Sequence, residues 1–457
     1  MKKINKLFLI LPALLLASCN FKYTYVISGI SADEEEGEEG EEGGIDDAGS
    51  YSIKVWVDQK IQSLTQAQID TFLADNPKYK ITYDVQPVSE GNATSNMLLD
   101  VQDGADLFVF AQDQLARLKV AGALGKITGS FADAIKEENS QDSVSAASLG
   151  DSIYAYPMTS DNGYFLMYDK RIYSESDVGN ISTMLAKIKG TNNKLYFKAQ
   201  SDGFYTASYF LARENGKPES AALCSNNWDL NLDTGLFTAF DDTFHEAPNG
   251  LIAAKGIKEI ADKALVASDN SVSKFAPGSG SASGTTAAAV VTGIWDYEAA
   301  YKRMGIKDAS GNIVDSYLGC AELPCYTVDG KDYHLGSYDG YKLMGIKPQR
   351  DAKKASVCRR LAAYLTGETC QTERFEQVSW GPTNKASSQD PGVVNHPGLA
   401  ALNKQHLYAT QQGQCPGEWF LALKTAASGV KTSSTDDELK TILNNYYAGL
   451  PVLLSDE

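Results

Sequence analysis

The chain has 457 residues, 43% of them hydrophobic, which is enough apolar material for two or three folded domains. Its formal net charge is −17, from 58 acidic and 41 basic side chains, and this acidic balance argues against nucleic-acid binding. The sequence contains no phosphate loop of the G-x-x-x-x-G-K-[ST] type, no G-x-S-x-G elbow and no H-E-x-x-H motif. No enzyme class therefore has positive motif support.

The N-terminus has the pattern of a signal peptide. Residues 1–6 carry three lysines, and residues 7–17 are apolar with one proline. This run is shorter than the roughly 20 apolar residues that cross a membrane. Ala17 and Ser18 directly before Cys19 resemble the bacterial lipobox, so we expect Cys19 to be lipidated and to hold the chain on the extracytoplasmic face of the cell membrane. An ordinary cleaved signal with a chance cysteine is the alternative.

An acidic segment follows the expected lipidation site. Residues 33–47 contain ten acidic side chains in fifteen positions and almost nothing apolar. Such a segment buries too little surface to fold, and charge repulsion extends it. We therefore interpret residues 1–18 as a signal peptide and 19–50 as a lipid anchor with an acidic tether. A specific cation-binding segment is the less favoured interpretation, because a flexible Glu/Gly run shows no clustered ligand geometry.

The folded part begins with alternating strand-like and helical patterns. Apolar residues recur at helical spacing in some segments, alternate in others, and form one near-continuous run typical of a buried parallel strand. These patterns predict strands at 51–59, 78–86 and 105–112, and helices at 62–77, 92–104 and 113–127. The β-α-β-α-β order predicts a doubly wound α/β lobe.

The same kinds of segment recur with different lengths further along the chain. A strand-like segment at 152–170 has a proline in its middle, and residues 226–235 read as a polar, aromatic loop. We predict helices at 180–190, 204–215, 251–268 and 351–367, and strands at 194–200, 287–293 and on both sides of a loop within 333–347.

Six cysteines remain after Cys19, at positions 224, 320, 325, 358, 370 and 415. An even number on an exported chain permits disulfides without implying them. Cys320 and Cys325 flank a turn-like loop, whereas Cys358 and Cys370 meet only if the chain bends between them. Four scattered histidines and the lack of C-x-x-C pairs argue against zinc, and we expect no metal or other cofactor.

Polar and aromatic residues gather where predicted strands end. They are Asp58, Gln59 and Lys60 after the first strand, Phe110, Gln112 and Asp113 after the third, and Trp295 and Tyr297 after the strand at 287–293. In open α/β sheets ligands bind outside these strand ends. Aromatic faces beside carboxylates and amides suit a sugar. The alternatives are that Trp295 and Phe110 are core aromatics and that Asp113 is the N-cap of its helix.

These stretches resemble the extracellular solute-binding proteins of ABC importers, in particular the carbohydrate branch typified by maltodextrin-binding proteins, in lipoprotein form. The likeness extends from about residue 51 to the end of the chain. Six segments show the likeness. Each matches the family only loosely, but their order and spacing along the chain are specific. They are residues 54–58, 105–127, 154–170, 194–205, 287–300 and 334–385.

The resemblance implies a fold of the periplasmic-binding-protein type II. It consists of two doubly wound α/β lobes joined by hinge segments, with the ligand enclosed between them. We expect lobe 1 to comprise residues 51–157 and 306–366, and lobe 2 to comprise residues 158–305 and 367–457.

The resemblance also implies ligand contacts in the first lobe. Asp58 and Lys60 fall where the family places polar sugar contacts, and Phe110 takes the place of an aromatic platform. Asp113 matches an aspartate that accepts hydrogen bonds from sugar hydroxyls, and Gln114 replaces the basic residue often found beside it.

In the second lobe, Asp202 and Phe204 match an acid and an aromatic of the family, and Trp295 matches its stacking tryptophan. Trp419 and Phe420 compete for the position of a further stacking ring. The implied function is that of a monomeric, membrane-anchored extracellular receptor, not an enzyme, that binds a sugar or oligosaccharide and delivers it to an ABC permease.

Two alternatives to this function remain open at the level of sequence. One is a non-sugar solute such as a peptide, a polyamine or an anion, although an anion site offers only Lys60 as a cation. The other is a surface glycan hydrolase, whose paired carboxylates are spatial and invisible in a sequence. In the favoured function, ligand stabilises a closed arrangement of the two lobes because it binds that state more tightly.

Overall fold

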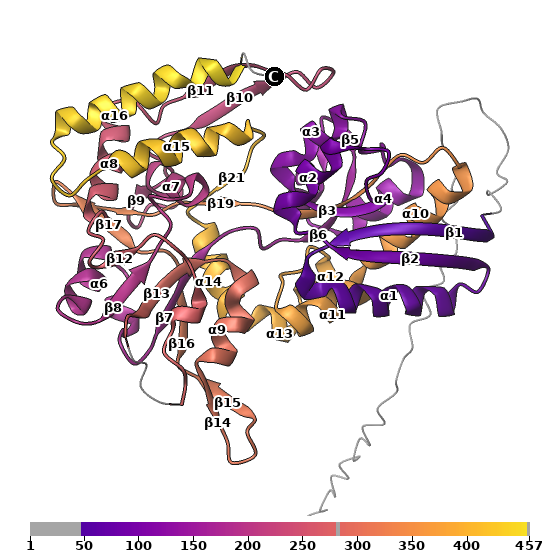
Figure 1. Cartoon of the computed structure of the whole chain (residues 1–457), viewed down its shortest axis with the longest axis horizontal. Helices are drawn as coiled ribbons and strands as arrows, with labels where there is room; N and C mark the ends of the chain where they lie inside the picture. Colours follow the sequence, from indigo (N-terminus) through magenta and orange to yellow (C-terminus); the bar gives the residue numbers. More distant parts are fainter. Residues whose placement is uncertain (1–46, 280–283, 455–457) are drawn as a thin grey trace, which may run out of the picture.

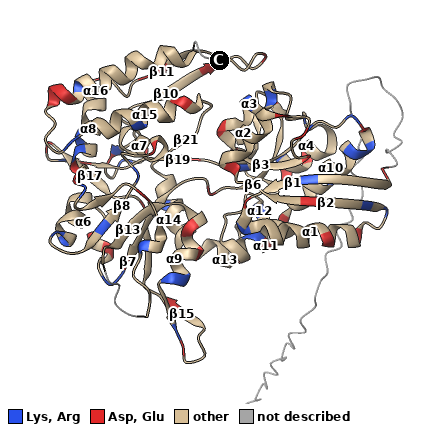
Figure 2. Ribbon diagram, in the orientation of Figure 1, with Lys and Arg blue, Asp and Glu red and all other residues tan. Residues whose placement is uncertain are grey.

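The computed structural model describes residues 47–279 and 284–454 (Figure 1). The predicted signal peptide, the lipidation at Cys19 and nearly all of the acidic tether lie outside these described residues. Within them, every helix is too short or too polar for a membrane span. Lysines and arginines are interspersed with acidic residues over both halves of the molecule (Figure 2).

The first lobe contains a five-stranded mixed sheet in the order β2-β1-β3-β20-β6. Its strands are β1 (Gly49–Val57), β2 (Tyr79–Pro87), β3 (Leu107–Ala111), β6 (Ala155–Thr159) and β20 (Lys342–Ile346). β1 pairs in parallel with β2 and β3, whereas β20 runs antiparallel to β3 and β6. The central strands β3 and β20 are buried almost throughout, which explains the continuous apolar run predicted as a buried strand.

Helices cover this sheet. They are α1 (Gln62–Asp75), α2 (Glu90–Leu99), α3 (Leu115–Val120), α4 (Gly129–Glu138), α5 (Gln141–Ala146), α10 (Ala352–Leu365), α11 (Glu368–Val378) and α12 (Lys385–Ser388). α1 packs against β2 and α10, and α2 against β3. The Gln68 side chain of α1 also donates to Glu373 and to the carbonyl of Cys370, which fixes α11 to this lobe.

The second lobe contains another five-stranded mixed sheet, in the order β12-β8-β13-β7-β16. Its strands are β7 (Phe165–Asp169), β8 (Asn193–Tyr196), β12 (Val266–Ala267), β13 (Thr286–Thr292) and β16 (Leu318–Ala321). Its helices are α6 (Ile181–Ile188), α7 (Gly203–Phe210), α8 (Asn249–Glu259), α9 (Tyr297–Arg303), α14 (Pro397–His406), α15 (Gly417–Gly429) and α16 (Asp436–Gly449). α15 packs between α7 and α16, as Figure 1 shows on the left.

Smaller hairpins project from the second lobe. They are β10 (Asn226–Leu230) with β11 (Phe237–Asp242), β14 (Gly305–Lys307) with β15 (Ile313–Ser316), and β17 (Cys325–Val328) with β18 (Lys331–His334), the last also pairing with β9 (Arg213–Glu214). The prediction of a loop at 226–235 missed the first of these hairpins. Its strands alternate poorly because mostly polar residues separate its aromatic side chains.

The chain passes between the lobes three times. It does so between β6 and β7, between β19 (Ser337–Asp339) and β20, and through α13 (Pro391–Val394) between α12 and α14. The strand β19 pairs in parallel with β21 (Ala409–Gln411), so the second crossing is tied to the segment that leads into α15. The expected fold class, two α/β lobes joined by hinge segments, is confirmed.

The lobe boundaries differ in part from those expected. The first crossing follows Thr159, close to the expected change at 157/158, and it splits the strand-like segment 152–170 into two strands of different sheets. β16 pairs with β7, so it belongs to lobe 2, whereas α11 and α12 pack on lobe 1. The change of lobe therefore occurs near residues 340 and 390 instead of 305/306 and 366/367, because strand pairing cannot be read from the spacing of apolar residues.

Asp47, the last residue of the acidic run 33–47, is folded. Its carboxylate is 1% exposed and accepts hydrogen bonds from Lys78 Nζ and Tyr79 Oη at 2.8 Å and from Arg360 Nε at 2.9 Å. Burial alone would raise the pKa of this carboxyl, but these bonds and one from Ser356 outweigh burial and lower the pKa to about 2. The folded part thus begins before Tyr51.

The six cysteines of the described residues are all free thiols. Cys320 lies in β16 and Cys325 in β17, on opposite sides of the turn-like loop, and they do not pair. Burial raises the pKa of Cys358 and of Cys370 to about 12, so both thiols are protonated at neutral pH.

Candidate functional site

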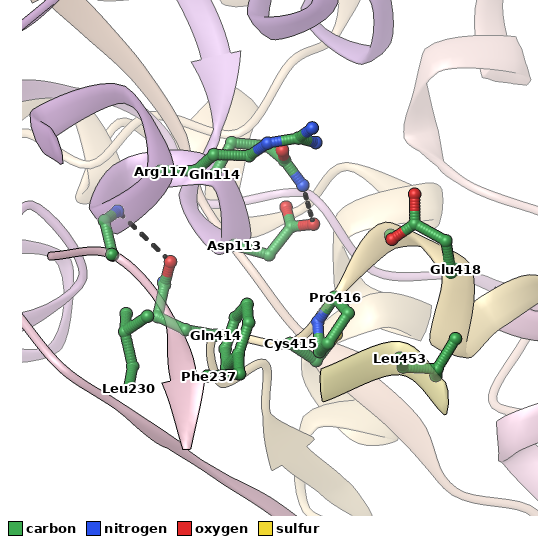
Figure 3. A pocket seen from close by; sticks show the side chains of 13 residues that line it. Asp113, Gln114, Arg117, Leu230, Phe237, Gln414, Cys415, Pro416, Glu418 and Leu453 are labelled. Carbon is green, nitrogen blue, oxygen red and sulfur yellow. Dashed lines mark hydrogen bonds between the residues drawn. The ribbon is translucent and has the colours of Figure 1, made fainter. Parts of the chain in front are cut away.

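A cavity of about 370 Å³ lies between the lobes. Lobe 1 contributes the turn after β3 and α3, and lobe 2 contributes the β10–β11 hairpin, the start of α15 and the C-terminal turn η6 (Leu450–Leu454) (Figure 3). The lining residues are Asp113, Gln114, Ala116, Arg117, Leu230, Gly235, Phe237, Gln414, Cys415, Pro416, Gly417, Glu418 and Leu453. The volume is at the lower end of the range of small-molecule sites, about 300–1,000 Å³.

On the lobe 1 side, Asp113 is the principal acceptor. Gln114 Nε2 donates to its Oδ2 at 2.7 Å, and burial raises the pKa of Asp113 to about 6. The carboxylate does not cap a helix, because the N-cap of α3 is Gln114 and lacks a side-chain cap. Arg117 lines the same cavity from α3 but forms no ion pair with Asp113.

On the lobe 2 side, Glu418 stands in the first turn of α15, where a negative charge is favoured by the helix dipole. Figure 3 shows Glu418 on α15, across the cavity from Asp113. Phe237 of β11 and Leu230 of β10 add apolar surface. The cavity therefore combines carboxylates from both lobes with amides, one guanidinium and an aromatic ring.

Gln112 connects the two lobes beside the cavity. Its side chain is 2% exposed, its Nε2 donates to the carbonyl of Gln412 at 2.8 Å, and its Oε1 accepts from the backbone N–H of Tyr341 at 2.9 Å. Gln414 returns a bond from its Nε2 to the Gln112 carbonyl at 2.9 Å. The end of β3 is thus tied both to a hinge crossing and to the segment before α15.

A second contact between the lobes lies at the other predicted strand ends. We call Lys60, Glu90, Asp161, Trp295, Lys342 and Trp380 the lysine cluster. Lys60 Nζ of lobe 1 donates to the Trp295 carbonyl of lobe 2 at 2.6 Å and lies 3.6 Å from Asp296. Asp58 shapes this turn by accepting from the Lys60 backbone N–H at 2.8 Å. Asp58, Lys60 and Trp295 are therefore close together.

Lys342 is the buried centre of the lysine cluster. Its side chain is fully buried, and its Nζ lies 3.4 Å from Glu90 and 3.8 Å from Asp161. The ammonium also lies 4.0 Å from the ring centroid of Trp380 and 5.4 Å from that of Trp295. Burial alone would lower the pKa of Lys342, but the two carboxylates outweigh it and raise the pKa.

An aromatic cluster surrounds Phe204 in lobe 2. The Phe204 ring stacks on Tyr338 at 5.5 Å and contacts Phe420 at 6.3 Å. Asp202 is the N-cap of α7 and accepts from the Phe204 backbone N–H at 3.1 Å. A Cβ at Gly203 would lie 2.1 Å from the Phe420 carbonyl oxygen, so α7 approaches α15 this closely only with glycine there.

Three predicted site residues lie in the cores of the lobes. Phe110 and Trp419 are 0% exposed and Tyr297 is 5% exposed. Phe110 belongs to the buried strand β3, and Trp419 Nε1 is satisfied internally by Asp242 and Tyr446. None of these rings lines the cavity, so Phe110 offers no platform, and Phe420 rather than Trp419 is the partly exposed ring of its pair.

Sequence reasoning missed several residues of both places. Arg117 and Glu418 lay within reach of it, one turn after Asp113 and directly before Trp419. Phe237, Lys342 and Trp380 had no such signal, because they come from a hairpin, a hinge-proximal strand and a helix end that only the folded chain brings close.

The family model for bacterial extracellular solute-binding proteins matches residues 67–401. A search of curated proteins finds no match. Among solved structures, the chain is similar to an unliganded maltodextrin-binding protein from L. casei BL23, with a TM-score of 0.67, 19% identity, and coverage of 89% of this chain and 100% of that chain.

Two further structures are similar to a comparable degree. A cyclo/maltodextrin-binding protein complexed with maltotetraose has a TM-score of 0.61 and 18% identity, covering 89% of this chain and 96% of that chain. MalX from Streptococcus pneumoniae, in complex with maltopentaose, has a TM-score of 0.63 and 14% identity, covering 88% and 99%. At these identities the likeness establishes the fold. The family match spans most of the chain, and the chain therefore belongs to the bacterial extracellular solute-binding proteins, the non-catalytic receptors of ABC importers.

Proposed function

We propose that this protein binds an oligosaccharide between its lobes and delivers it to an ABC permease. The observation that carries this proposal is the cavity of about 370 Å³ in which Asp113 and Glu418 approach from opposite lobes beside the amides of Gln114 and Gln414. Carboxylate and amide groups offer the acceptors and donors that sugar hydroxyls require, and Phe237 offers a face for the C–H groups of a sugar ring.

The solved structures that resemble this chain support a carbohydrate ligand. Those named above are described as maltodextrin-binding or as bound to maltotetraose or maltopentaose. Because the sequence identities are 14% to 19%, this support extends to the class of ligand and not to a particular sugar.

The arrangement of the cavity also explains how a ligand would close the lobes. Neither the Asp113 side nor the Glu418 side makes enough contacts alone, because each contributes only part of the lining. A ligand that touches both sides gains its full binding free energy only in the closed arrangement and therefore shifts the population toward it.

Calorimetric titration with a series of linear maltodextrins tests the proposal. We expect Asp113→Asn and Glu418→Gln each to weaken binding by about 1.5–3 kcal/mol, the loss typical of a hydrogen bond to a charged group. Asp133→Asn, an exposed carboxylate on α4, is the matched control and should bind like the wild-type protein. Wild-type affinity in both cavity variants would exclude the cavity as the sugar site.

We further propose that Cys19 is lipidated and holds the receptor at the extracytoplasmic face of the cell membrane. The small residues Ala17 and Ser18 before this cysteine support the proposal. Metabolic labelling with an alkyne fatty acid should label the wild-type chain and leave Cys19→Ala unlabelled. Equal labelling of both chains would contradict lipidation at this residue.

A further inference from the structure

The β10–β11 hairpin reaches from lobe 2 to α3 of lobe 1. At its tip the carbonyl of Leu232 accepts a hydrogen bond from Lys119 Nζ at 2.6 Å. Gly235 packs directly on Val120, since a Cβ at this glycine would lie 2.6 Å from the valine side chain. The two lobes therefore touch each other through the tip of this hairpin.

The tip has a defined shape of its own. The Asn231 side-chain Oδ1 accepts from the backbone N–H groups of Asp233 at 2.9 Å and Thr234 at 3.0 Å, an Asx-turn arrangement. The N–H of Gly235 donates to the Asn231 carbonyl at 2.7 Å, and Gly235 has a φ of +71°, which glycine adopts without strain. Because these hydrogen bonds already fix the conformation of the tip, it loses little conformational entropy when it contacts α3.

The base of the hairpin is fixed to the body of lobe 2 by aromatic contacts. The Trp228 ring lies 4.9 Å from Phe240, and Phe240 lies 5.7 Å from Tyr447 of α16. The indole of Trp228 is 9% exposed. A hairpin held at its base in this way moves with lobe 2 and contacts lobe 1 only when the lobes are close.

The same hairpin forms one side of the interlobe cavity. Leu230, Gly235 and Phe237 line it, facing Ala116 and Arg117 of α3. The tip contacts Lys119 and Val120, which follow the lining residue Arg117 by two and three positions, so the lobes touch at this edge of the cavity. A groove that ends in this way accepts the end of a chain but offers no path for a chain that runs on in both directions.

We propose that the β10–β11 hairpin makes this protein a receptor for oligosaccharide chain ends. It closes one end of the cavity, so a linear oligosaccharide enters with its terminal unit against Leu230 and Phe237. A ligand without a chain end is excluded. This inference rests on the proposed function and adds to it the part of the ligand that is recognised.

A linear and a cyclic glucan with the same number of glucose units test this inference, because they differ in the presence of chain ends. We would titrate maltoheptaose and β-cyclodextrin into the wild-type protein by calorimetry and expect the linear sugar to bind at least about tenfold more tightly. The tip variant replaces residues 231–236 by Asn-Gly, the sequence preferred for a two-residue hairpin turn, and keeps Trp228 and Phe240 at the base. In this variant the tenfold difference should disappear through a gain in affinity for β-cyclodextrin.

Lys119→Met is the second variant and leaves the hairpin intact. It removes only the hydrogen bond to Leu232, and it should reduce the linear-to-cyclic ratio without abolishing it. Its thermal unfolding should match that of the wild-type protein, which excludes misfolding as the cause.

The outcomes separate the inference from the proposed function. Equal affinity of the wild-type protein for both sugars overturns the inference alone, and so does a linear-to-cyclic ratio that persists unchanged in the tip variant. Failure of the wild-type protein to bind either sugar overturns a glucan as the oligosaccharide of the proposed function, and the inference with it.

Discussion

The two places where the lobes meet contain similar kinds of side chain but compensate their charges differently. In the interlobe cavity, Asp113 has the amide of Gln114 as its hydrogen-bond partner and forms no ion pair within the described residues, and burial raises its pKa to about 6. In the lysine cluster, Glu90 and Asp161 face the ammonium of Lys342 at 3.4 and 3.8 Å.

This difference indicates a division of roles. A half-buried carboxylate whose only side-chain partner is an amide gains from any donor that enters, and sugar hydroxyls are donors. The carboxylates of the lysine cluster already have their cation, and the cluster combines residues from α2, from the first hinge crossing, from β20 and from lobe 2. We therefore expect substitutions in the lysine cluster to act mainly on stability and substitutions in the cavity to act mainly on binding.

The largest effect should come from Lys342→Met. This change leaves Glu90 and Asp161 without their buried cation, and removal of one partner of a buried ion pair costs about 3–5 kcal/mol. Urea unfolding should show this loss in the free energy of unfolding. Lys440→Met is the control, because Lys440 lies in an exposed ion pair with Asp437 at 3.2 Å and its loss should cost less than about 1 kcal/mol. Similar losses in both variants would remove the distinction between the two places.

Trp295→Ala sharpens the comparison, because Trp295 belongs to the lysine cluster but is partly exposed. If the ligand extends from the cavity to this ring, as the family resemblance implies, its removal should weaken sugar binding by about 2 kcal/mol, at the level of a binding hot spot. Stability should change by less than the binding free energy, since the ring is only partly buried where it packs against the core and its cation–π contact to Lys342 is distant. Trp295→Phe should fall in between. Unchanged affinity in Trp295→Ala would confine the ligand to the cavity.

The fold was largely predictable because the central strands of each lobe are apolar runs in the sequence. β3 and β13 are buried along nearly their whole length. An apolar run of this kind identifies a strand even when its pairing partners are not known. The lobe changes were less predictable. The segments on both sides of residues 160–164 have strand-like patterns. Only the pairing of these strands shows that β6 and β7 belong to different sheets.

The candidate site was predictable in part. Asp113 and Lys60 follow strand ends, where position in the chain determines position at the sheet edge. Phe110 shows why the same rule fails for aromatic residues. It precedes Asp113 by three positions but points from a strand covered on both faces, so its ring is 0% exposed. A strand-end rule selects the edge of the sheet and does not distinguish a core ring from a platform.

Residues contributed by other segments were beyond sequence reasoning. Lys342 appears in the sequence as an ordinary lysine at the start of an apolar strand, and its burial depends on Glu90, Asp161 and Trp380, which lie far away in the chain. The β10–β11 hairpin was not predicted because its sequence is mostly polar and resembles that of a loop.

The pH dependence of stability provides a smaller effect specific to the cavity. The folded protein holds the Asp113 proton up to a pKa of about 6, whereas the unfolded chain releases it near 3.8. Between these values the unfolded state binds fewer protons, so the free energy of unfolding decreases as pH rises. After allowance for partial exposure, the decrease is on the order of 1–2 kcal/mol. Urea unfolding at pH 4 and pH 7 should show this contribution in the wild-type protein and not in Asp113→Asn.

The comparison with Asp113→Asn is needed because two histidines, the buried His334 and the half-buried His396, act in the opposite direction. Burial lowers the pKa of His334 and of His396 to about 4, so their contribution to stability falls as the pH decreases below about 6.5. Both histidines are present in both proteins, and their effect cancels in the difference. An identical pH dependence of the two proteins would mean that Asp113 is not held protonated by burial.

Replacement of Lys60 should have the smallest effect on the free energy of unfolding. It tests whether the energy of a contact depends on its burial or on its position between the lobes. Lys60 joins the lobes, as Lys342 does, but its side chain is 45% exposed and that of Asp296 is 26% exposed. An exposed ion pair contributes about 0–1 kcal/mol and is screened by salt. We therefore expect Lys60→Met to lower the free energy of unfolding by less than about 1 kcal/mol and the loss to shrink at 1 M salt. Asp296→Asn should add nothing once Lys60 is replaced, which a double-mutant cycle measures. A loss as large as that of Lys342→Met, unchanged by salt, would show that contact between the lobes and not burial sets the energy.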